Sequence, residues 1–536
     1  MRMTPLARNV SFDGQMASNT ASPLRVEFGQ VDELHVRSRL RIVPPNSSRT
    51  LEEPHPFEQL TTRQGRPLKV AILSDFTRIP YANGAAFQTR FLYQELRRCG
   101  HEVTVIGPHD PDARPDELAP GTVSLPSVPL KAYPGVHIPM PLAGWVYDAE
   151  RWDFDIVFAQ TTSMLMEFGV WLRKMKGIPL LCVNTTHLAA AYDVLLPEKL
   201  SKIDAVHAGL DLVFRRPFER QFASIYNDSD GLVVLSEGLR RYWRERGVTA
   251  PIHVIPRAVQ PEVFDRPLGE DPYSFLGTSD GPRLLCAGRH TREKSQDRVI
   301  RIFAQHVLPE APNATLTLLG VGPETEFYRR LAGELGVGDR VHFPGEVPFT
   351  KMTDFYAHAD VFVHASLSET YGNVMGEALW CGTPTVAFAD GMGVSAQIED
   401  GVNGILLAPG RRGPEEDAAD AAFGRAVIGL IEDPTRRGAL GHAAARVARD
   451  RAHPRAIQAK IVDAFRSAQD HAAACGLRPM LAGPRALQWY TTFQHFRPWT
   501  TVMGGIYLFG HLRPAKTKRK EALQPQFAGP AAPSAS

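Results

Sequence analysis

The hydrophobic pattern of the chain changes at residue 68, where short apolar runs begin to alternate with segments of helical spacing. The run LKVAILSDF at 68–76 is typical of a strand that is buried on both faces of a parallel sheet. Residues 88–98 have the spacing of an amphipathic helix, and Gly100 is a helix stop before the next apolar run. The alternation continues to the run GLVVLS at 231–236. It predicts a series of strand–helix–strand units.

A second series of the same kind follows the proline-bounded joint PIHVIPRAVQPEVF at 251–264. The run RLLCAGR at 283–289 predicts its first strand, and residues 294–306 predict the helix that comes next. Two such series predict an α/β fold with two tandem Rossmann-like, doubly wound domains. Because ligands bind beyond the carboxyl ends of parallel strands, we expect the two domains to face each other across a cleft.

Composition favours a globular protein and argues against one that coats nucleic acid. Hydrophobic residues make up 43% of the chain and charged residues 22%, which is typical of a globular protein of several domains. The 60 basic and 58 acidic side chains give a formal charge of only +2, which argues against a protein that coats nucleic acid.

Cysteine usage and the absence of long apolar stretches predict a cytoplasmic location. The five cysteines form no C-x-x-C pair, which predicts a reducing compartment and no disulfide framework. The first residues lack the apolar run of a signal peptide, and no stretch reaches the roughly 18 apolar residues of a membrane helix. We therefore expect a cytoplasmic protein whose contact with a membrane is at most peripheral.

The segment SLSETYGNVMGEALWCGTPTVAF at 366–388 carries two carboxylates eight residues apart. Glu369 lies in the loop that follows an apolar run, and Glu377 lies within the first turns of the next predicted helix. A carboxylate such as Glu377 can accept two hydrogen bonds from the cis-diol of a sugar. The backbone amides at 372–374, where the helix begins, suit a phosphate group.

The segment AGRHTREKSQDRVI at 287–300 places two cations after another predicted strand. Gly288 lets the backbone turn tightly, and Arg289 and Lys294 bracket the loop that follows. A planar guanidinium and an ammonium group at the end of a strand suit the diphosphate of a leaving nucleotide. These two residues therefore predict a diphosphate site that needs no metal ion.

Four motifs in register resemble one known family. They are the Glu369…Glu377 segment, the G-R-x-x-x-E-K run at 288–294, the LLGVGPE loop at 318–324 and the PGEVP turn at 344–348. Together they resemble the retaining GT-B glycosyltransferases of glycosyltransferase family 4, from about Leu68 to Ala448. Each pair of charged residues alone would also suit a solvated surface, but their order along the chain favours a functional site. The resemblance implies transfer of a hexosyl group with retention of configuration, from GDP-mannose or a UDP-hexose to a hydroxyl group.

The resemblance also assigns roles to single residues. In the amino-terminal half only Gly84 remains of the family's glycine-rich loop, and His187 stands where the family has a histidine against the donor sugar. Arg257 replaces the asparagine of the family's joint, which suggests either a stiffer joint or an extra cation facing the cleft. The assigned residues are catalytic His187 and Glu369, diphosphate-binding Arg289, Lys294, Gly372, Asn373 and Val374, ribose-binding Glu377, base-binding Val347, and Gly84 in the first loop on the acceptor side.

The resemblance and the composition together predict five segments. They are a mostly disordered leader at 1–66, an acceptor domain at 67–255, a nucleotide-sugar donor domain at 256–448, helices that cross back at 449–485, and an aromatic and basic tail at 486–536.

Two alternatives for a cofactor are weaker. Asp-x-Asp patterns at 110–112, 153–155 and 228–230 are reminiscent of metal ligands, but the last two directly precede apolar runs and suit polar turns at strand starts. The GVG at 320–322 lacks the third glycine of a dinucleotide fingerprint. We predict no metal and no cofactor, because the nucleotide sugar is a substrate.

The acceptor is predicted only by class, as a lipid or glycan. Basic and aromatic residues gather at 214–218, at 239–246 and in the tail, where residues 476–536 hold 8 Lys+Arg and 1 Asp+Glu. Such segments suit an anionic membrane surface, at the inner face of the cell membrane. For the segments at 214–218 and 239–246, ordinary solvated helix faces are the commoner explanation. For the tail, a helix packed on the first domain explains the residues as well as a membrane surface does. A nucleotide-sugar-binding protein without activity, a phosphorylase with a pyridoxal-bearing lysine and a transferase for a soluble sugar remain alternatives.

Overall fold

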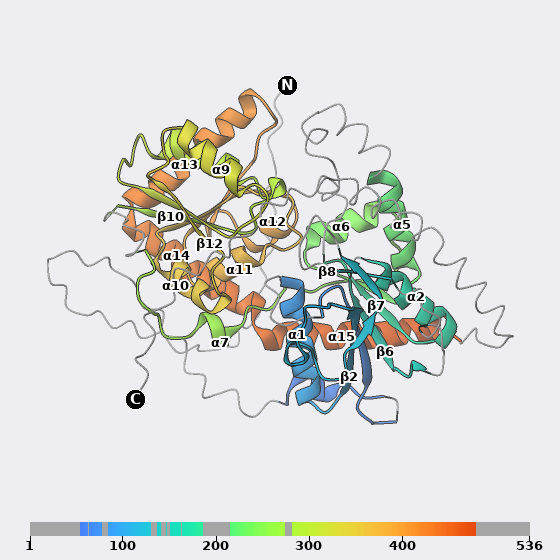
Figure 1. Ribbon diagram of the computed structural model, residues 1–536. Coiled ribbons are helices and arrows are strands. Elements are labelled where there is room, and N and C mark those ends of the chain that lie inside the picture. Colours follow the sequence, from blue (N-terminus) through green and yellow to red (C-terminus); the bar gives the residue numbers. More distant parts are fainter. Residues whose placement is uncertain are drawn as a thin grey trace, which may run out of the picture. The chain divides into compact units, whose positions relative to one another are not determined.

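The computed structural model describes residues 54–62, 64–77, 84–129, 137–140, 146, 151–161, 163–185, 215–273 and 281–478. These residues form two parallel sheets with helices on both faces of each (Figure 1). This arrangement confirms the prediction of two doubly wound domains. Among the residues in these ranges, no helix is long and apolar enough to cross a membrane.

The first sheet has the strand order β3-β2-β1-β6-β7-β8-β9, and all its pairs are parallel. The order reverses direction between β1 and β6, as in a Rossmann-type sheet. The strands are β1 (Lys69–Ser74), β2 (Glu102–Pro108), β3 (Val123–Leu125), β6 (Ile156–Gln160), β7 (Leu180–Val183), β8 (Gly231–Val234) and β9 (Ile252–Val254). Beside this sheet, β4 (Ser127–Pro129) and β5 (His137–Pro139) form a short antiparallel pair.

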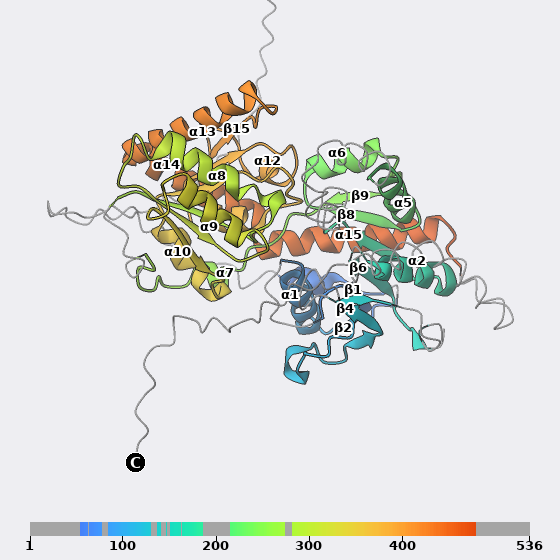
Figure 2. The ribbon, with the colours of Figure 1, turned by 45° about the horizontal axis from the view of Figure 1, so that its top comes forward.

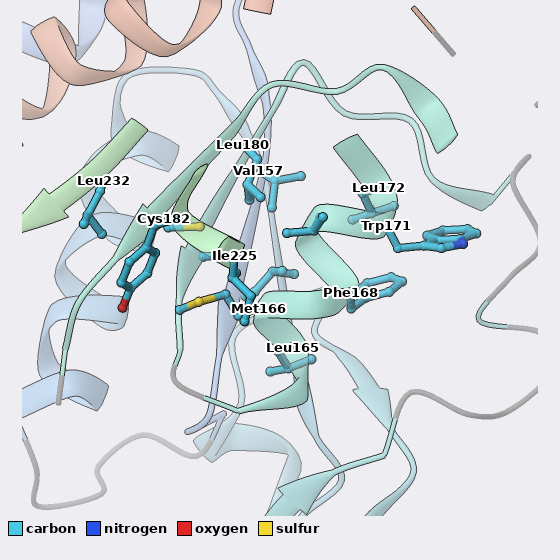
Figure 3. Close-up of a cluster of buried hydrophobic side chains, with 14 of the residues drawn as sticks. Val157, Leu165, Met166, Phe168, Trp171, Leu172, Leu180, Cys182, Ile225 and Leu232 are labelled. Atoms are coloured by element: carbon cyan, nitrogen blue, oxygen red, sulfur yellow. The ribbon is translucent and has the colours of Figure 1, made fainter. Parts of the chain in front are cut away.

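Successive side chains of β1 enter two different apolar clusters, because neighbouring residues of a strand point to opposite faces. Ala71 and Leu73 lie in the cluster where α2 packs on β6 and β7. Figure 3 shows other members of this cluster, among them Val157 of β6 and Phe168 of α2. Val70 and Ile72 lie in the cluster on the opposite face. The helices on the first face are α2 (Met164–Lys176), α5 (Arg216–Asn227) and α6 (Glu237–Glu245).

The opposite face of the first sheet is covered by two helices that are distant in sequence. One is α1 (Gly84–Arg98), and the other is α15 (Pro454–Ala474), the last described helix of the chain. Figure 2 shows α15 beside β8, and Phe465 of α15 contacts Phe158 of β6 with ring centroids 5.7 Å apart. The first sheet is therefore completed by a helix that follows the whole second sheet in sequence.

The second sheet has the strand order β12-β11-β10-β13-β14-β15, again with all pairs parallel and a reversal in the middle. Its strands are β10 (Arg283–Ala287), β11 (Thr315–Leu319), β12 (Val341–Gly345), β13 (Val361–His364), β14 (Thr385–Phe388) and β15 (Ile405–Leu407). One face is covered by α8 (Gln296–Ile302), the π-helical turn Phe303–Val307, α9 (Thr325–Glu334) and α13 (Pro414–Glu432). The other face is covered by α7 (Pro261–Phe264), α10 (Met352–His358), α11 (Asn373–Trp380) and α14 (Pro434–Ala452), and α12 (Gly393–Gln397) follows β14.

Folded structure begins earlier in the chain than residue 68, where the hydrophobic pattern predicts the first strand. A short 3₁₀ helix, Pro56–Gln59, lies inside the segment expected to be a disordered leader, and Phe57 and Leu60 are buried in the cluster beneath α1. These two apolar residues add to a core that other segments form. The hydrophobic pattern of the short segment alone does not predict this packing. Residues 1–53 and the tail at 486–536 lie outside the described residues.

Candidate active site

The candidate site forms where the strand order of the second sheet reverses. β10 and β13 are neighbours there, and the connections that leave them run to opposite sides, which opens a crevice suited to a ligand. Lys294 lies on the loop after β10, and Glu369 lies on the loop after β13. The two predicted motifs therefore meet at the same point of the sheet.

The loop after β10 differs from the prediction in one respect that shapes the site. Lys294 ends a 3₁₀ turn, Arg292–Lys294, and Ser295 has a left-handed backbone with φ 51° before α8 begins. The helix predicted to start at 294 therefore starts at 296, because Ser295 adopts a conformation that no helix propensity encodes. This turn leaves Lys294 on the loop, with its Nζ 2.6 Å from Oε1 of Glu369.

The loop after β13 is held by hydrogen bonds to backbone carbonyls. The Ser366 hydroxyl donates to the carbonyl of Glu293 at 3.2 Å, and the Gly393 amide donates to the carbonyl of Glu369 at 3.0 Å. Gly372 has φ 79° and caps the start of α11, a conformation that glycine adopts without strain. These bonds fix the backbone on both sides of Glu369.

Glu369 is charged although it is only 7% exposed. Burial acts to raise the pKa of its carboxyl, but Lys294 and then His364 outweigh burial and hold that pKa well below its usual value. Nε2 of His364 lies 3.3 Å from the same Oε1 that Lys294 contacts. The site thus contains a carboxylate with two nitrogen groups on one oxygen.

Glu377 lies on α11 in a different environment. The Tyr356 hydroxyl donates to its Oε2 at 2.8 Å. Burial raises the pKa of Glu377 to about 7, and the hydrogen bond from Tyr356 opposes that rise. Part of the side chain remains accessible to solvent. Glu377 therefore combines a fixed orientation with a carboxyl that titrates near neutral pH.

The first turn of α11 carries no side-chain cap. Gly372 occupies the N-cap, and α11 starts at Asn373, as predicted. The first amides of a helix lack partners within the helix, so those of Asn373 and Val374 are available to an acceptor. These residues lie between Glu369 and Glu377 in sequence.

The remaining donor-side residues lie on neighbouring loops. Arg289 is exposed on the loop after β10, and Val347 is half-buried just after β12. The loop after β11 lies between the loops that carry Arg289 and Val347. The Gly320 amide of this loop donates to the carbonyl of Gly345, at the end of β12, at 2.8 Å. A Cβ at Gly320 would lie 2.1 Å from the carbonyl oxygen of Gly288, so the backbones pack directly against each other.

The amino-terminal half contributes less described structure to the site. Gly84 is the first residue of α1. His187 lies outside the described residues, and the described part of its segment ends at Thr185, just after β7. The Thr370 hydroxyl donates to the carbonyl of Thr185 at 3.2 Å. The segment that leads to His187 is therefore bonded to the loop that carries Glu369.

Arg257 is buried rather than exposed as a cation. Burial lowers its pKa to about 10, and the Tyr371 hydroxyl, next to Thr370 in the loop of Glu369, opposes that change. The burial of Arg257 therefore favours a side chain packed into the joint over an extra cation that faces a cleft.

The Asp-x-Asp patterns take part in ion pairs. Asp155 receives a two-pronged contact from Arg66, at 2.7 and 2.9 Å, and Lys69 contacts Asp153 at 2.6 Å. Asp230 receives a similar contact from Arg173. Within the described ranges, no group of three or more His, Cys, Asp or Glu side chains is arranged to hold a metal ion.

Two residues of the site were not predicted. His364 closes β13, and its position at the carboxyl end of a strand was the signal that was overlooked. Tyr356 lies on α10, and no sequence pattern links it to Glu377. The contact of His364 with Glu369 is local, whereas that of Tyr356 with Glu377 depends on the packing of α10 near α11.

Comparisons with known proteins identify the family of the chain. The family model for glycosyl transferases group 1 matches residues 275–447, and the model for Glycosyltransferase Family 4 matches residues 82–263. An alpha-monoglucosyldiacylglycerol synthase of Streptococcus pneumoniae is 28% identical over 60% of this chain and 71% of its own length. A D-inositol 3-phosphate glycosyltransferase of Catenulispora acidiphila is 30% identical over 54% of this chain and 68% of its own length.

Solved structures support the same fold. A sucrose-phosphate synthase from Thermosynechococcus elongatus has a TM-score of 0.58 at 23% identity and covers 76% of this chain and 99% of its own. Anabaena HepE in complex with UDP and glucose has a TM-score of 0.57 at 20% identity and covers 75% of this chain and all of its own. The family and the fold that the four motifs predicted are confirmed: the chain belongs to the GT-B glycosyltransferases of family 4 and group 1.

Proposed function

We propose that the protein transfers a hexosyl group from a nucleotide diphosphate sugar, GDP-mannose or a UDP-hexose, to a hydroxyl group of a membrane glycolipid or phospholipid, with retention of configuration. The observation that carries the proposal is the Lys294–Glu369 contact of 2.6 Å at the strand reversal, with Glu377 on the helix that follows.

Charge and hydrogen-bonding capacity support the donor half of the proposal. The diphosphate needs cations and amide donors when the anomeric bond breaks, and Lys294, Arg289 and the amides of residues 372–374 supply them without a metal ion. Glu377 accepts the ribose hydroxyls with the oxygen that Tyr356 leaves open. The nucleotide base lies against the backbone near Val347.

The reacting centre lies between the two sheets in this proposal. Glu369 and His187 flank the donor sugar, and the loop around Gly84 faces the acceptor. The hydrogen bond between Thr370 and Thr185 supports this assignment, because it joins the loop of Glu369 to the segment that leads to His187. The leaving phosphate and the attacking hydroxyl share one face of the sugar, which retains the configuration.

The acceptor class is supported by relatives. One is a GDP-mannose-dependent phosphatidylinositol monomannoside mannosyltransferase of Mycolicibacterium smegmatis, and another is the synthase of a glucosyldiacylglycerol in Streptococcus pneumoniae. A soluble acceptor is the second candidate, because a D-inositol 3-phosphate glycosyltransferase is 30% identical to this chain. Transfer assays separate the two acceptor classes. They compare phosphatidylinositol or diacylglycerol glycolipid in vesicles with soluble inositol phosphate as the acceptor.

Substitution of Glu377 tests the donor site. Glu377→Ala removes the carboxylate oxygen that accepts the ribose hydroxyls, so we expect donor affinity to fall roughly 10- to 100-fold, as for the loss of a hydrogen bond to a charged group. Isothermal calorimetry with GDP-mannose and UDP-glucose measures the affinity directly. Glu326→Ala is the matched control, because Glu326 is an exposed helix carboxylate of the same domain. Unchanged affinity in Glu377→Ala would remove the ribose role.

The choice of donor and the stereochemistry need separate measurements. A bound donor stabilises the folded protein by mass action, so a thermal-shift screen of GDP- and UDP-sugars identifies the donor. NMR of the first-formed product reports the anomeric configuration and contradicts the proposal if the product is inverted. Full activity after EDTA treatment is expected, since the proposed site needs no metal.

A further inference from the structure

One oxygen of Glu369 faces two nitrogen groups. Nζ of Lys294 lies 2.6 Å from Oε1, and Nε2 of His364 lies 3.3 Å from the same atom. The exposed fractions of the side chains are 26% for Lys294, 9% for Glu369 and 4% for His364. The histidine is thus the more deeply buried of the two partners.

His364 is held in place by its own surroundings. It is the last residue of β13, and its ring is stacked on that of Phe362 with an interplanar angle of 15°. Nε2 of His364 faces Glu369 at 3.3 Å and helps to hold the pKa of that carboxyl low, but within the described residues it makes no hydrogen bond of normal geometry. A buried polar atom without a hydrogen bond is costly, so its position beside a carboxylate calls for an explanation.

Lys294 has two competing partners in the proposed reaction. In this structure it contacts Glu369, while the donor's diphosphate would offer it a larger negative charge. If Lys294 turns to the diphosphate, Glu369 loses the cation closest to it. A buried carboxylate without a counterion is strongly destabilised, and it would take up a proton or move.

We propose that His364 is a positioning residue, which takes over the carboxylate of Glu369 when Lys294 turns to the diphosphate of the donor. The inference rests on the proposed function, because it requires a donor that draws Lys294 away. Nε2–H of His364 then donates to Oε1, the atom that Lys294 has released. Glu369 keeps its charge and its place beside the sugar while the glycosidic bond breaks.

Substitution of His364 tests the inference. His364→Leu keeps most of the volume but removes the donor, and His364→Gln retains an N–H group near the place of Nε2. We expect kcat of His364→Leu to fall roughly 10- to 100-fold, the range for loss of a hydrogen bond to a charged group. We expect donor Kd, measured by calorimetry, to change by less than about threefold, because His364 does not contact the donor. His364→Gln should restore part of kcat.

A double-substitution cycle separates positioning from packing. In a Glu369→Gln background, His364→Leu should cause no further loss of kcat, because the carboxylate that it positions is gone. His306→Leu is the matched control, since His306 is a half-buried histidine on the π-helical turn of the same domain and contacts none of these residues. Thermal melting of each variant confirms that it is folded, and His364→Met, which also lacks an N–H donor, serves if His364→Leu does not fold.

Two outcomes overturn the inference and leave the proposed function intact. One is a loss of kcat in His364→Leu that persists unchanged in the Glu369→Gln background. The other is a loss of donor affinity as large as the loss of kcat, which would make His364 part of the donor pocket. If the unsubstituted protein binds no nucleotide sugar, the proposed function fails instead, and the two failures are therefore distinguishable.

Discussion

At the scale of single residues, the two glutamates of one motif have opposite electrostatics. Lys294 and His364 hold the pKa of Glu369 low, whereas Glu377 is buried beside a neutral tyrosine and its pKa rises to about 7. One carboxyl is therefore charged at every physiological pH, and the other is close to half-protonated near neutrality. Eight residues of sequence separate two groups suited to different tasks.

The raised pKa of Glu377 predicts a pH dependence of donor binding. Only the charged carboxylate can accept hydrogen bonds from both ribose hydroxyls, so donor affinity should rise as the pH increases through about 7 and level off above it. Calorimetric titration of the donor between pH 5.5 and 8.5 measures this dependence. Glu377→Gln carries no titrating group and should bind weakly with no such step.

Substitution of Tyr356 tests whether Glu377 causes this pH dependence, because the hydrogen bond from Tyr356 stabilises the charged form of Glu377. In Tyr356→Phe this stabilisation is lost, so the pKa of Glu377 rises further and the midpoint of the pH dependence moves upward. A midpoint that stays in place would show that the step belongs to another group, such as the donor itself.

The residues of the site were predictable to different degrees. Glu369, Glu377, Arg289 and Lys294 belong to contiguous motifs whose spacing carries chemical meaning, so the sequence predicted them. His364 and Tyr356 could not be assigned in the same way. His364 contacts Glu369 locally, five positions along the chain, but the shared oxygen also contacts Lys294 only because β10 pairs with β13. Tyr356 contacts Glu377 because α10 packs near α11, which depends on tertiary structure.

At the scale of secondary-structure elements, a single buried carboxylate joins three of them. Asp230, just before β8, receives two bonds of 2.8 Å from Arg173 of α2 and one of 2.9 Å from the amide of Leu180 at the start of β7. His471 of α15 lies 3.1 Å from the same carboxylate. The position that was predicted as a polar turn is thus an anchor between helices and sheet.

Removal of this anchor should be costly. Asp230→Ala leaves the guanidinium of Arg173, which is 13% exposed, without its counterion, and such a break costs roughly 3–5 kcal/mol. Asp228→Ala is the matched control two residues away, because the Asp228–Lys174 pair is much more exposed and such pairs contribute about 0–1 kcal/mol. Urea unfolding measures both free energies, and equal losses would contradict the proposed role of Asp230.

Regular elements were easier to predict than the turns between them. Strands such as β1 and β10 are continuous apolar runs, and their burial on both faces follows from that composition. The start of α8 was predicted two residues too early, because the left-handed backbone of Ser295 is imposed by the packed loop around it. The 3₁₀ helix at 56–59 was missed because a short segment has no periodicity of its own.

At the scale of the whole molecule, the near-neutral charge conceals an uneven distribution. Residues 67–475 have a net charge of −7, and residues 476–536 have a net charge of +7. An anionic membrane attracts a basic segment by about 1 kcal/mol for each Lys or Arg near its surface. We propose that the tail draws the enzyme to the inner face of the membrane where a lipid acceptor lies.

Deletion of residues 486–536 tests that proposal. The shortened protein should lose binding to phosphatidylglycerol vesicles in a sedimentation assay and retain transfer to an acceptor dissolved in detergent. Replacement of Lys516, Lys518, Arg519 and Lys520 by glutamine is the matched variant, because it removes charge and keeps length. Unchanged vesicle binding in both variants would favour a tail that packs on the protein.

The position of α15 has a consequence for how the protein is made. A ribosome delivers the strands of the first sheet early, but one apolar face of that sheet is covered partly by residues 454–474. Until those residues emerge, Phe158 and its neighbours remain exposed to water, and exposed apolar surface invites aggregation. We therefore expect the half of the chain that is synthesised first to complete its core only after the second sheet has been translated. Chaperone dependence should be greatest while the second sheet is still being translated.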